Sequence, residues 1–304
     1  AIGVNRVSLG GQSFDNGVLE ALGRRHRSGD VLEAAGWLAE AHCQGRLASW
    51  NLDLIQAVPG HDLTSWRAQL QQAVALKPPH LSVYDLTIEP GTVFARQQEQ
   101  GLLSLPEEEL AADLMELTQA ELCRWGYGHY EISNYALPGH ASRHNRVYWS
   151  GAGWWGFGMG ATSAPYGQRQ AHPRTRNDYA SWLGARNEKT SPEAEREQWP
   201  LDERLMVGLR RREGVHLPSL LAETGWAVEE QAGALKQLKR LLDPFCRDGL
   251  IVMEGPRWRL SDPRGLALSN VVLRQLLAWW DGTALQSSGA APARPADDPG
   301  AGVH

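Results

Sequence analysis

The chain has 304 residues, of which 42% are hydrophobic, and its formal net charge is −5 at neutral pH. An apolar fraction of this size supports a packed core and excludes a disordered protein. The acidic balance argues against general affinity for nucleic acid or for an anionic membrane. No run is long and apolar enough to span a bilayer, and no secretory signal is apparent, so we expect a cytoplasmic protein.

Strands and helices alternate along the first part of the chain. Apolar runs that favour strands cover residues 5–10, 48–55, 80–86 and 129–133. Patterns that favour helices lie between them, at residues 18–22, 30–43, 63–76 and 106–125. This alternation predicts βαβ units that build a parallel sheet.

The first of these strands has no earlier segment to pair with. An apolar strand at an open edge of a sheet is an aggregation hazard. A complete (β/α) barrel takes about 250 residues, and only four of its units are visible here. We therefore expect residues 1–135 to be the later part of a parallel (β/α) barrel whose opening units are missing.

The rest of the chain divides by composition. Residues 136–183 are rich in glycine, aromatic residues and histidine and predict a loop-rich segment, and residues 184–200 are polar and predict a linker. Three helical patterns and a two-stranded hairpin over residues 201–280 predict a winged-helix-like domain. Residues 281–304 are rich in Ala, Pro, Gly and Ser, which predicts a disordered tail.

A winged-helix-like domain raises the alternative of nucleic-acid binding. The third predicted helix carries basic residues, but acidic residues interrupt them, so no basic face emerges. These residues are Lys236, Lys239, Arg240, Glu229, Glu230 and Asp243. We expect no nucleic-acid partner.

Chemistry in a parallel barrel lies at the carboxyl ends of the strands, where three features fall. The Gly10-Gly11-Gln12 run either lets the backbone approach a ligand or forms a tight βα turn. Arg24 either holds a carboxylate or is a solvated surface residue. Asp53 sits within an apolar strand, where a carboxylate must be paired; it either binds a ligand such as a ribose or caps a neighbouring loop.

Histidine and cysteine offer further candidates. His140 and His144 are four residues apart, which suits a metal on one helix face. No third ligand is spaced for zinc, whereas a single histidine among aromatic residues is able to ligate haem iron. Cys43, Cys123 and Cys246 are far apart and predict neither disulfides nor a metal site, so we expect buried or inert thiols.

The order of these motifs is more specific than any one of them. Residues 3–14, 22–24, 51–55, 59–60 and 81–92 together resemble the radical S-adenosylmethionine proteins related to oxygen-independent coproporphyrinogen III oxidase. Within that family, residues 130–135 (YEISNY) and 144–149 (HNRVYW) are similar to the HemW branch, the haem chaperones. The resemblance covers about residues 1–280.

The resemblance implies roles for particular residues. Gln12 would contact S-adenosylmethionine, Arg24 would hold its methionine carboxylate, and Asp53 would take its ribose hydroxyls. Thr87 would line the same site, and His144 would contact haem. Family members also hold a [4Fe–4S] cluster with a Cys-x3-Cys-x2-Cys motif, which none of the three cysteines of this chain matches. No catalytic residue and no metal ligand is therefore assigned.

The function implied is that of a haem chaperone, with haem-accepting apo-proteins as partners and peripheral contact with a membrane through such recipients. The alternative is oxidative decarboxylation of coproporphyrinogen III in porphyrin biosynthesis. The sequence leaves open whether the chain is an enzyme, and it also leaves open the oligomeric state.

Overall fold

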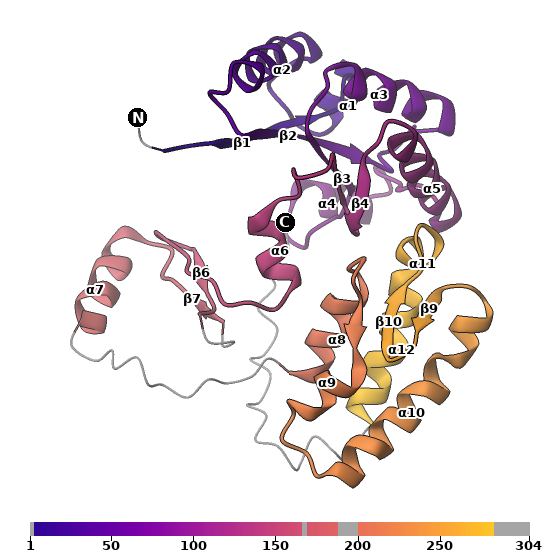
Figure 1. Ribbon diagram of the computed structural model, residues 1–304. Helices are drawn as coiled ribbons and strands as arrows, with labels where there is room; N and C mark the ends of the chain where they lie inside the picture. Colours follow the sequence, from indigo (N-terminus) through magenta and orange to yellow (C-terminus); the bar gives the residue numbers. More distant parts are fainter. Residues whose placement is uncertain (1–2, 166–168, 188–199, 283–304) are drawn as a thin grey trace. The chain divides into compact units, whose positions relative to one another are not determined.

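The computed structural model describes residues 3–165, 169–187 and 200–282 (Figure 1). Within these residues the chain forms two compact units. The first unit comprises residues 1–141 and 261–268, and the second comprises residues 142–260 and 269–291, in each case as far as they are described. Most of the predicted linker and nearly all of the predicted tail lie outside the described residues.

The first unit is built on a five-stranded sheet in the order β1-β2-β3-β5-β4. The strands are β1 (Arg6–Gln12), β2 (Ser49–Gln56), β3 (His80–Asp85), β4 (Gly128–Glu131) and β5 (Asn134–Ala136). β1, β2 and β3 are parallel, as the βαβ pattern predicts. The α/β class and the parallel strands are thus confirmed.

The predicted fourth unit is wrong in detail. β5 was not expected; it pairs antiparallel with both β3 and β4 and separates them. The short Ile132–Ser133 connection explains this, because two residues allow only a hairpin, whereas a parallel crossover needs a dozen or more. Among the described residues the sheet does not close into a barrel, and β1 and β4 form its edges.

Helices connect the strands of this unit. They are α1 (Asn16–Ala21), α2 (Ser28–Cys43), α3 (Leu63–Ala75), α4 (Val93–Glu99) and α5 (Glu108–Arg124). All but α4 were predicted. Figure 1 shows α2 and α3 on the same side of the sheet. Side chains of α2, α3 and α5 join those of β2 and β3 in one buried cluster, so these helices cover one face of the sheet.

The apolar core follows from alternation along the strands. Trp50, Leu52 and Leu54 of β2 point to the helix-covered face and are completely buried. They pack in one cluster with Trp66 of α3 and Leu114 of α5. Because successive side chains of a strand point to opposite faces, the residues between these three lie on the other face of the sheet.

The second unit begins with a segment that was expected to be mostly loop. It contains α6 (Arg143–Trp149), α7 (Arg176–Asn187) and the antiparallel pair β6 (Thr162–Ser163) and β7 (Gln170–Ala171). The Ser142 hydroxyl caps α6 by accepting a hydrogen bond from the backbone N–H of Asn145. A capped helix therefore holds the 144–149 motif.

The remainder of this unit combines helices with a three-stranded antiparallel sheet in the order β8-β10-β9. Its elements are α8 (Leu201–Leu209), β8 (Val215–His216), α9 (Leu217–Ala222), α10 (Val228–Arg247), β9 (Ile251–Glu254), β10 (Arg257–Leu260) and α12 (Ser269–Asp281). Trp258 of β10, Leu205 of α8 and Leu238 of α10 are buried in its core.

In the described part of the chain, two helices follow β10, and they belong to different units. α11 (Arg264–Ala267) belongs to the first unit and contacts α5, and α12 starts at Ser269 in the second unit. In the first unit His129 Nδ1 lies 2.8 Å from Asp262 Oδ1, which anchors this returning segment. Residues 261–268 thus complete the first unit although they follow most of the second in sequence.

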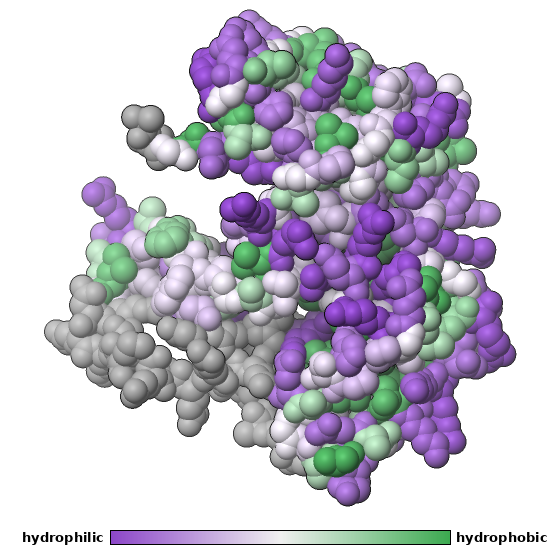
Figure 2. Space-filling model, viewed as in Figure 1, coloured by the Kyte–Doolittle hydropathy of each residue, from purple (hydrophilic) through white to green (hydrophobic). Residues whose placement is uncertain are grey.

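The surface is mostly hydrophilic on the side drawn in Figure 2, where hydrophobic residues are scattered among hydrophilic ones. None of the described helices combines the length and the hydropathy that a membrane crossing requires.

Candidate functional site

The face of the sheet opposite the helices in the first unit carries polar side chains in register. Arg6, Ser8 and Gly10 of β1 pair with Ser49, Asn51 and Asp53 of β2. Asn51 and Asp53 in turn pair with His80 and Ser82 of β3. Side chains in register on neighbouring strands lie about 5 Å apart, so these residues form one continuous polar surface.

Asp53 is the acidic centre of this surface. Its Oδ2 accepts a hydrogen bond of 2.9 Å from the Ser8 hydroxyl, and its Oδ1 accepts one of 2.5 Å from the Asn51 amide. Burial raises the pKa of Asp53, and the hydrogen bonds from Ser8 and Asn51 act against that rise. The Asp53 side chain is only partly buried. The carboxylate is therefore held by hydrogen bonds from the strands and is still open to a ligand.

Gln12 lies at the carboxyl end of β1 with φ +64°, a left-handed conformation that turns the chain out of the strand. A Cβ added to Gly10 would come within 2.9 Å of Gln12 Nε2, so the amide of Gln12 lies over Gly10. A Cβ added to Gly11 would come within 2.8 Å of Leu52 Cδ1 on the helix-covered face. Glycine is therefore needed at the two positions for different reasons. At position 10 it leaves room for the Gln12 amide, and at position 11 it avoids a clash with the core.

Arg24 and Thr87 are placed at the same end of the sheet but less closely. Arg24 is exposed in the connection between α1 and α2, which follows β1. Thr87 is exposed just beyond β3, with its hydroxyl 3.5 Å from the Asp85 carbonyl oxygen. Within the described part of the chain, no hydrogen bond joins either residue to Asp53. The structure thus brings Gln12 and Asp53 together at the carboxyl end of the parallel strands. Arg24 and Thr87 lie at the margin of that end.

His144 belongs to the second unit and is exposed on α6. Its ring meets that of Tyr148 edge to face at 4.9 Å, and the Tyr148 ring lies 4.6 Å from that of Trp154. His140 precedes the helix, and its Nδ1 is 3.0 Å from Ser49 Oγ of the first unit's sheet. The two histidines therefore do not share a helix face.

The described residues contain no group of three or more His, Cys, Asp or Glu side chains that could hold a metal ion. Cys43 and Cys123 are exposed and lie near helix ends, so of the two alternatives expected for these thiols, buried or inert, burial does not apply to them. These cysteines do not fit the thiolate ligand set that a [4Fe–4S] cluster requires.

Sequence reasoning missed most of the polar surface. His80, Ser82, Asn134 and Glu131 are all nearly fully buried, and they continue it across β3, β5 and β4. Ser82 donates to Asn134 at 2.7 Å, and Asn134 donates to Glu131. The available signal was the period of two: polar residues recur at every second position of β2 and β3, although each strand is apolar overall.

Comparison with known proteins places the chain in a family. It is 37% identical over 295 residues to the heme chaperone HemW of Synechocystis sp., covering 91% of this chain and 69% of that protein. It is 31% identical over 274 residues to the heme chaperone HemW of Lactococcus lactis, covering 90% of this chain and 69% of that protein. The search against family models returned no match.

Among solved structures, the fold is similar to that of the Escherichia coli coproporphyrinogen III oxidase HemN, described as a radical SAM enzyme. The TM-score is 0.64 with 18% sequence identity, and the match covers 90% of this chain and 64% of that one. At this identity the similarity concerns the fold alone. Together with the sequence relatives, it shows that the chain belongs to the HemW family of haem chaperones, whose fold is related to that of coproporphyrinogen III oxidase.

Proposed function

We propose that this chain binds haem and passes it to haem-accepting apo-proteins. The observation that carries the proposal is His144, an exposed imidazole on a capped helix, in a member of the haem-chaperone family. A neutral imidazole is a common axial ligand of haem iron. Haem is here the cargo, and exchange with a recipient requires a ligand that solvent and partners can reach.

The surroundings of His144 support this role. Tyr148 and Trp154 continue from it as a series of aromatic rings within the same unit. Aromatic side chains pack well on a flat conjugated macrocycle through offset or edge-to-face contacts. His144 would supply the iron ligand, and these rings would contact the porphyrin.

The sheet of the first unit fits an adenosyl ligand. Asp53 offers a partly open carboxylate for two ribose hydroxyls, and the Gln12 amide lies at the same edge. Arg24 would hold the methionine carboxylate, and Thr87 would line the margin. S-adenosylmethionine supplies an activated sulfonium centre when bound. Because the cysteines of this chain do not fit a [4Fe–4S] cluster, no step is assigned to one.

We also propose a role for residues 201–280 and a place where the carrier acts. Residues 201–280 would form a winged-helix-like domain without a nucleic-acid role, and the carrier would act in the cytoplasm, reaching membranes only through its recipients. Oxidative decarboxylation of coproporphyrinogen III is less well supported, because the oxidase shares the fold at low identity, whereas the haem chaperones share the sequence.

Haem titration followed by absorbance in the Soret region tests the proposal. Substituting His144→Ala should weaken haem binding about tenfold or more and shift the Soret band, because the iron loses its imidazole. His42→Ala is the matched control, since His42 is a half-buried histidine on α2 of the other unit. If both variants titrate like the unmodified protein, His144 is not the ligand; if the unmodified protein does not bind haem, the carrier function fails.

A further inference from the structure

Asn51 lies at the centre of the hydrogen bonds on the polar surface and links Asp53 to His80. It is 6% exposed in the middle of β2. Its amide nitrogen lies 2.5 Å from Asp53 Oδ1 and 2.9 Å from the hydroxyl oxygens of Ser8 and Ser82. Its amide oxygen lies 2.5 Å from His80 Nδ1. The whole amide is therefore held between Asp53 on one side and His80 on the other.

The hydrogen bonds from His80 to Asn51 and from Asn51 to Asp53 form a series, and Asp53 sets the direction of each bond in it. An ionised carboxylate only accepts hydrogen bonds, so the amide nitrogen of Asn51 must face Asp53 and its oxygen must face His80. Since that oxygen only accepts, His80 must carry a proton on Nδ1. Burial lowers the pKa of His80 to about 3, with Arg6 and His140 acting in the same direction, so the ring holds a single proton.

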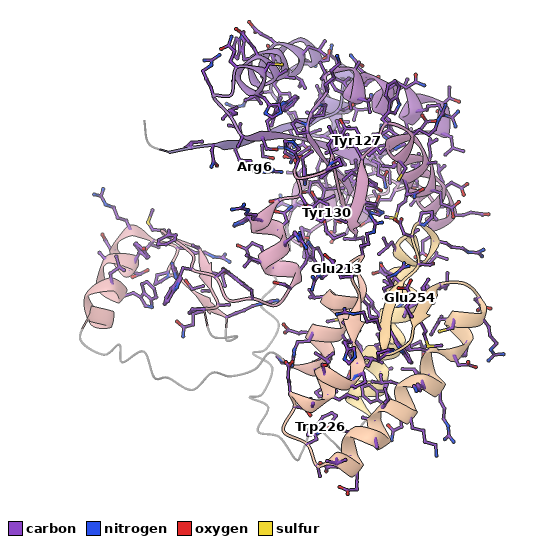
Figure 3. All side chains as sticks on the ribbon, in the orientation of Figure 1. Arg6, Tyr127, Tyr130, Glu213, Trp226 and Glu254 are labelled. Carbon is purple, nitrogen blue, oxygen red and sulfur yellow. The ribbon has the colours of Figure 1, made fainter. Side chains whose placement is uncertain are left out.

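Tyr130 completes the series. With its one proton on Nδ1, His80 accepts at Nε2, and the Tyr130 hydroxyl lies 2.7 Å from that nitrogen. Tyr130 comes from β4 and Arg6 from β1, both labelled in Figure 3. The bonds thus run one way, from Tyr130 to His80, from His80 to Asn51 and from Asn51 to Asp53. Reversing any one of them would leave two donors or two acceptors facing each other.

The arrangement fixes the carboxylate and leaves part of it available. Each oxygen of Asp53 accepts one bond from the strands, Oδ1 from Asn51 and Oδ2 from Ser8. A carboxylate has about four acceptor positions, so each oxygen keeps one for a ligand. Two acceptors held at a fixed spacing suit two neighbouring hydroxyls, because a preorganised site loses less entropy on binding.

We propose that Asn51, held in place by His80 and Tyr130, is a positioning residue that orients Asp53 toward the vicinal diol of a ribose. This inference rests on the proposed adenosyl site and adds the residues that give that site its preference for ribose over deoxyribose. Asn51 touches Asp53 and not the ligand, so its removal should affect the diol contact and spare contacts with the base.

The test compares adenosine with 2′-deoxyadenosine as titrants of the 304-residue chain, by calorimetry or saturation-transfer NMR. The unmodified protein should bind adenosine at least about tenfold more tightly, because a site built for a hydroxyl rejects the analogue that lacks it. In Asn51→Leu the two affinities should become equal through a loss for adenosine, with the affinity for 2′-deoxyadenosine changed less than about twofold. A purely structural role would weaken both nucleosides alike.

A second pair of variants keeps the test decisive if Asn51→Leu does not fold. His80→Asn retains a side-chain N–H near the position of Nδ1 and should preserve the preference for adenosine. His80→Leu removes it and should abolish the preference.

The outcomes separate the inference from the function on which it rests. A preference that survives in a folded Asn51→Leu, or in His80→Leu, overturns the positioning role and leaves the adenosyl site intact. Failure of the unmodified protein to bind either nucleoside overturns both.

Discussion

The two faces of the sheet in the first unit are built from the same strands and have opposite character. On the helix-covered face, Trp50, Leu52 and Leu54 are buried among apolar side chains of α2, α3 and α5. On the other face, Asn51 and Asp53 alternate with them and join a hydrogen-bonded polar surface. Strands of this kind look uniformly buried in sequence, yet each contributes to two different environments.

The two faces of the sheet contribute differently to folding stability and to ligand binding. Apolar burial on one face stabilises the fold by about 25 cal/mol per Å² of area removed from water. Polar groups on the other face contribute little net stability, because their hydrogen bonds replace equivalent bonds to water. Substitutions on the first face should therefore affect unfolding most, and those on the second should affect ligand binding most.

The largest effect is expected on the apolar face. Leu52→Ala should lower the free energy of unfolding by about 3 kcal/mol, because Leu52 is completely buried and truncation leaves a cavity. Urea denaturation measures the loss. Ser8→Ala in the neighbouring strand is the control, since Ser8 is exposed, and it should cost less than about 1 kcal/mol. Equal losses would contradict the division between the faces.

An intermediate effect is expected from acid. His80 has a folded pKa of about 3 against an ordinary value of 6.5, so below pH 6.5 the unfolded chain binds a proton that the folded chain does not. The stability contributed by neutral His80 is complete above pH 6.5 and is lost as the pH falls toward 3. By pH 5 the loss amounts to about 2 kcal/mol.

Urea midpoints at pH 7 and pH 5 check this contribution. His80→Asn removes the titrating ring and should flatten the pH dependence by the amount that His80 accounts for. His26→Asn is the control, because it removes a histidine that is less buried. An identical slope in the unmodified protein and in His80→Asn would show that His80 does not titrate on unfolding.

The smallest effect on stability is expected at the centre of the polar surface. Burial raises the pKa of Asp53, so this group contributes stability below its unfolded pKa of 3.8, and that contribution is lost as the pH rises through the folded pKa. At pH 7 the ionised carboxylate is a cost, which Asp53→Asn removes along with two accepted bonds. We expect a net change in unfolding free energy within about 1 kcal/mol and a loss of adenosine preference. A loss of several kcal/mol in denaturation would instead make Asp53 a structural residue.

Local pattern was enough to predict most of the elements. The helical spacing over residues 63–76 corresponds to α3, and the helical pattern over residues 106–125 corresponds to α5. The hairpin of β4 and β5 was missed because β5 has only three residues, too few to show a period. α6 was missed for a similar reason, since its seven residues lie in a glycine-rich and aromatic stretch.

The candidate site was predictable in part. Gln12 and Asp53 follow from the rule that ligands bind at the carboxyl ends of parallel strands. Asn51 and His80 do not follow from it, because they lie 29 positions apart in sequence, and only the register of β2 with β3 places their side chains in contact. Neither residue type is unusual enough alone to predict a positioning role.

The sequence by itself determined the α/β class, the parallel order of the first three strands and membership of the haem-chaperone family, because these depend on local periodicity and on motifs that are contiguous in the chain. The tertiary structure decided which face of each strand is polar, how Asp53 is held, and that residues 261–268 return to the first unit. These features depend on pairing register and on contacts between distant segments, which no local window of the sequence contains.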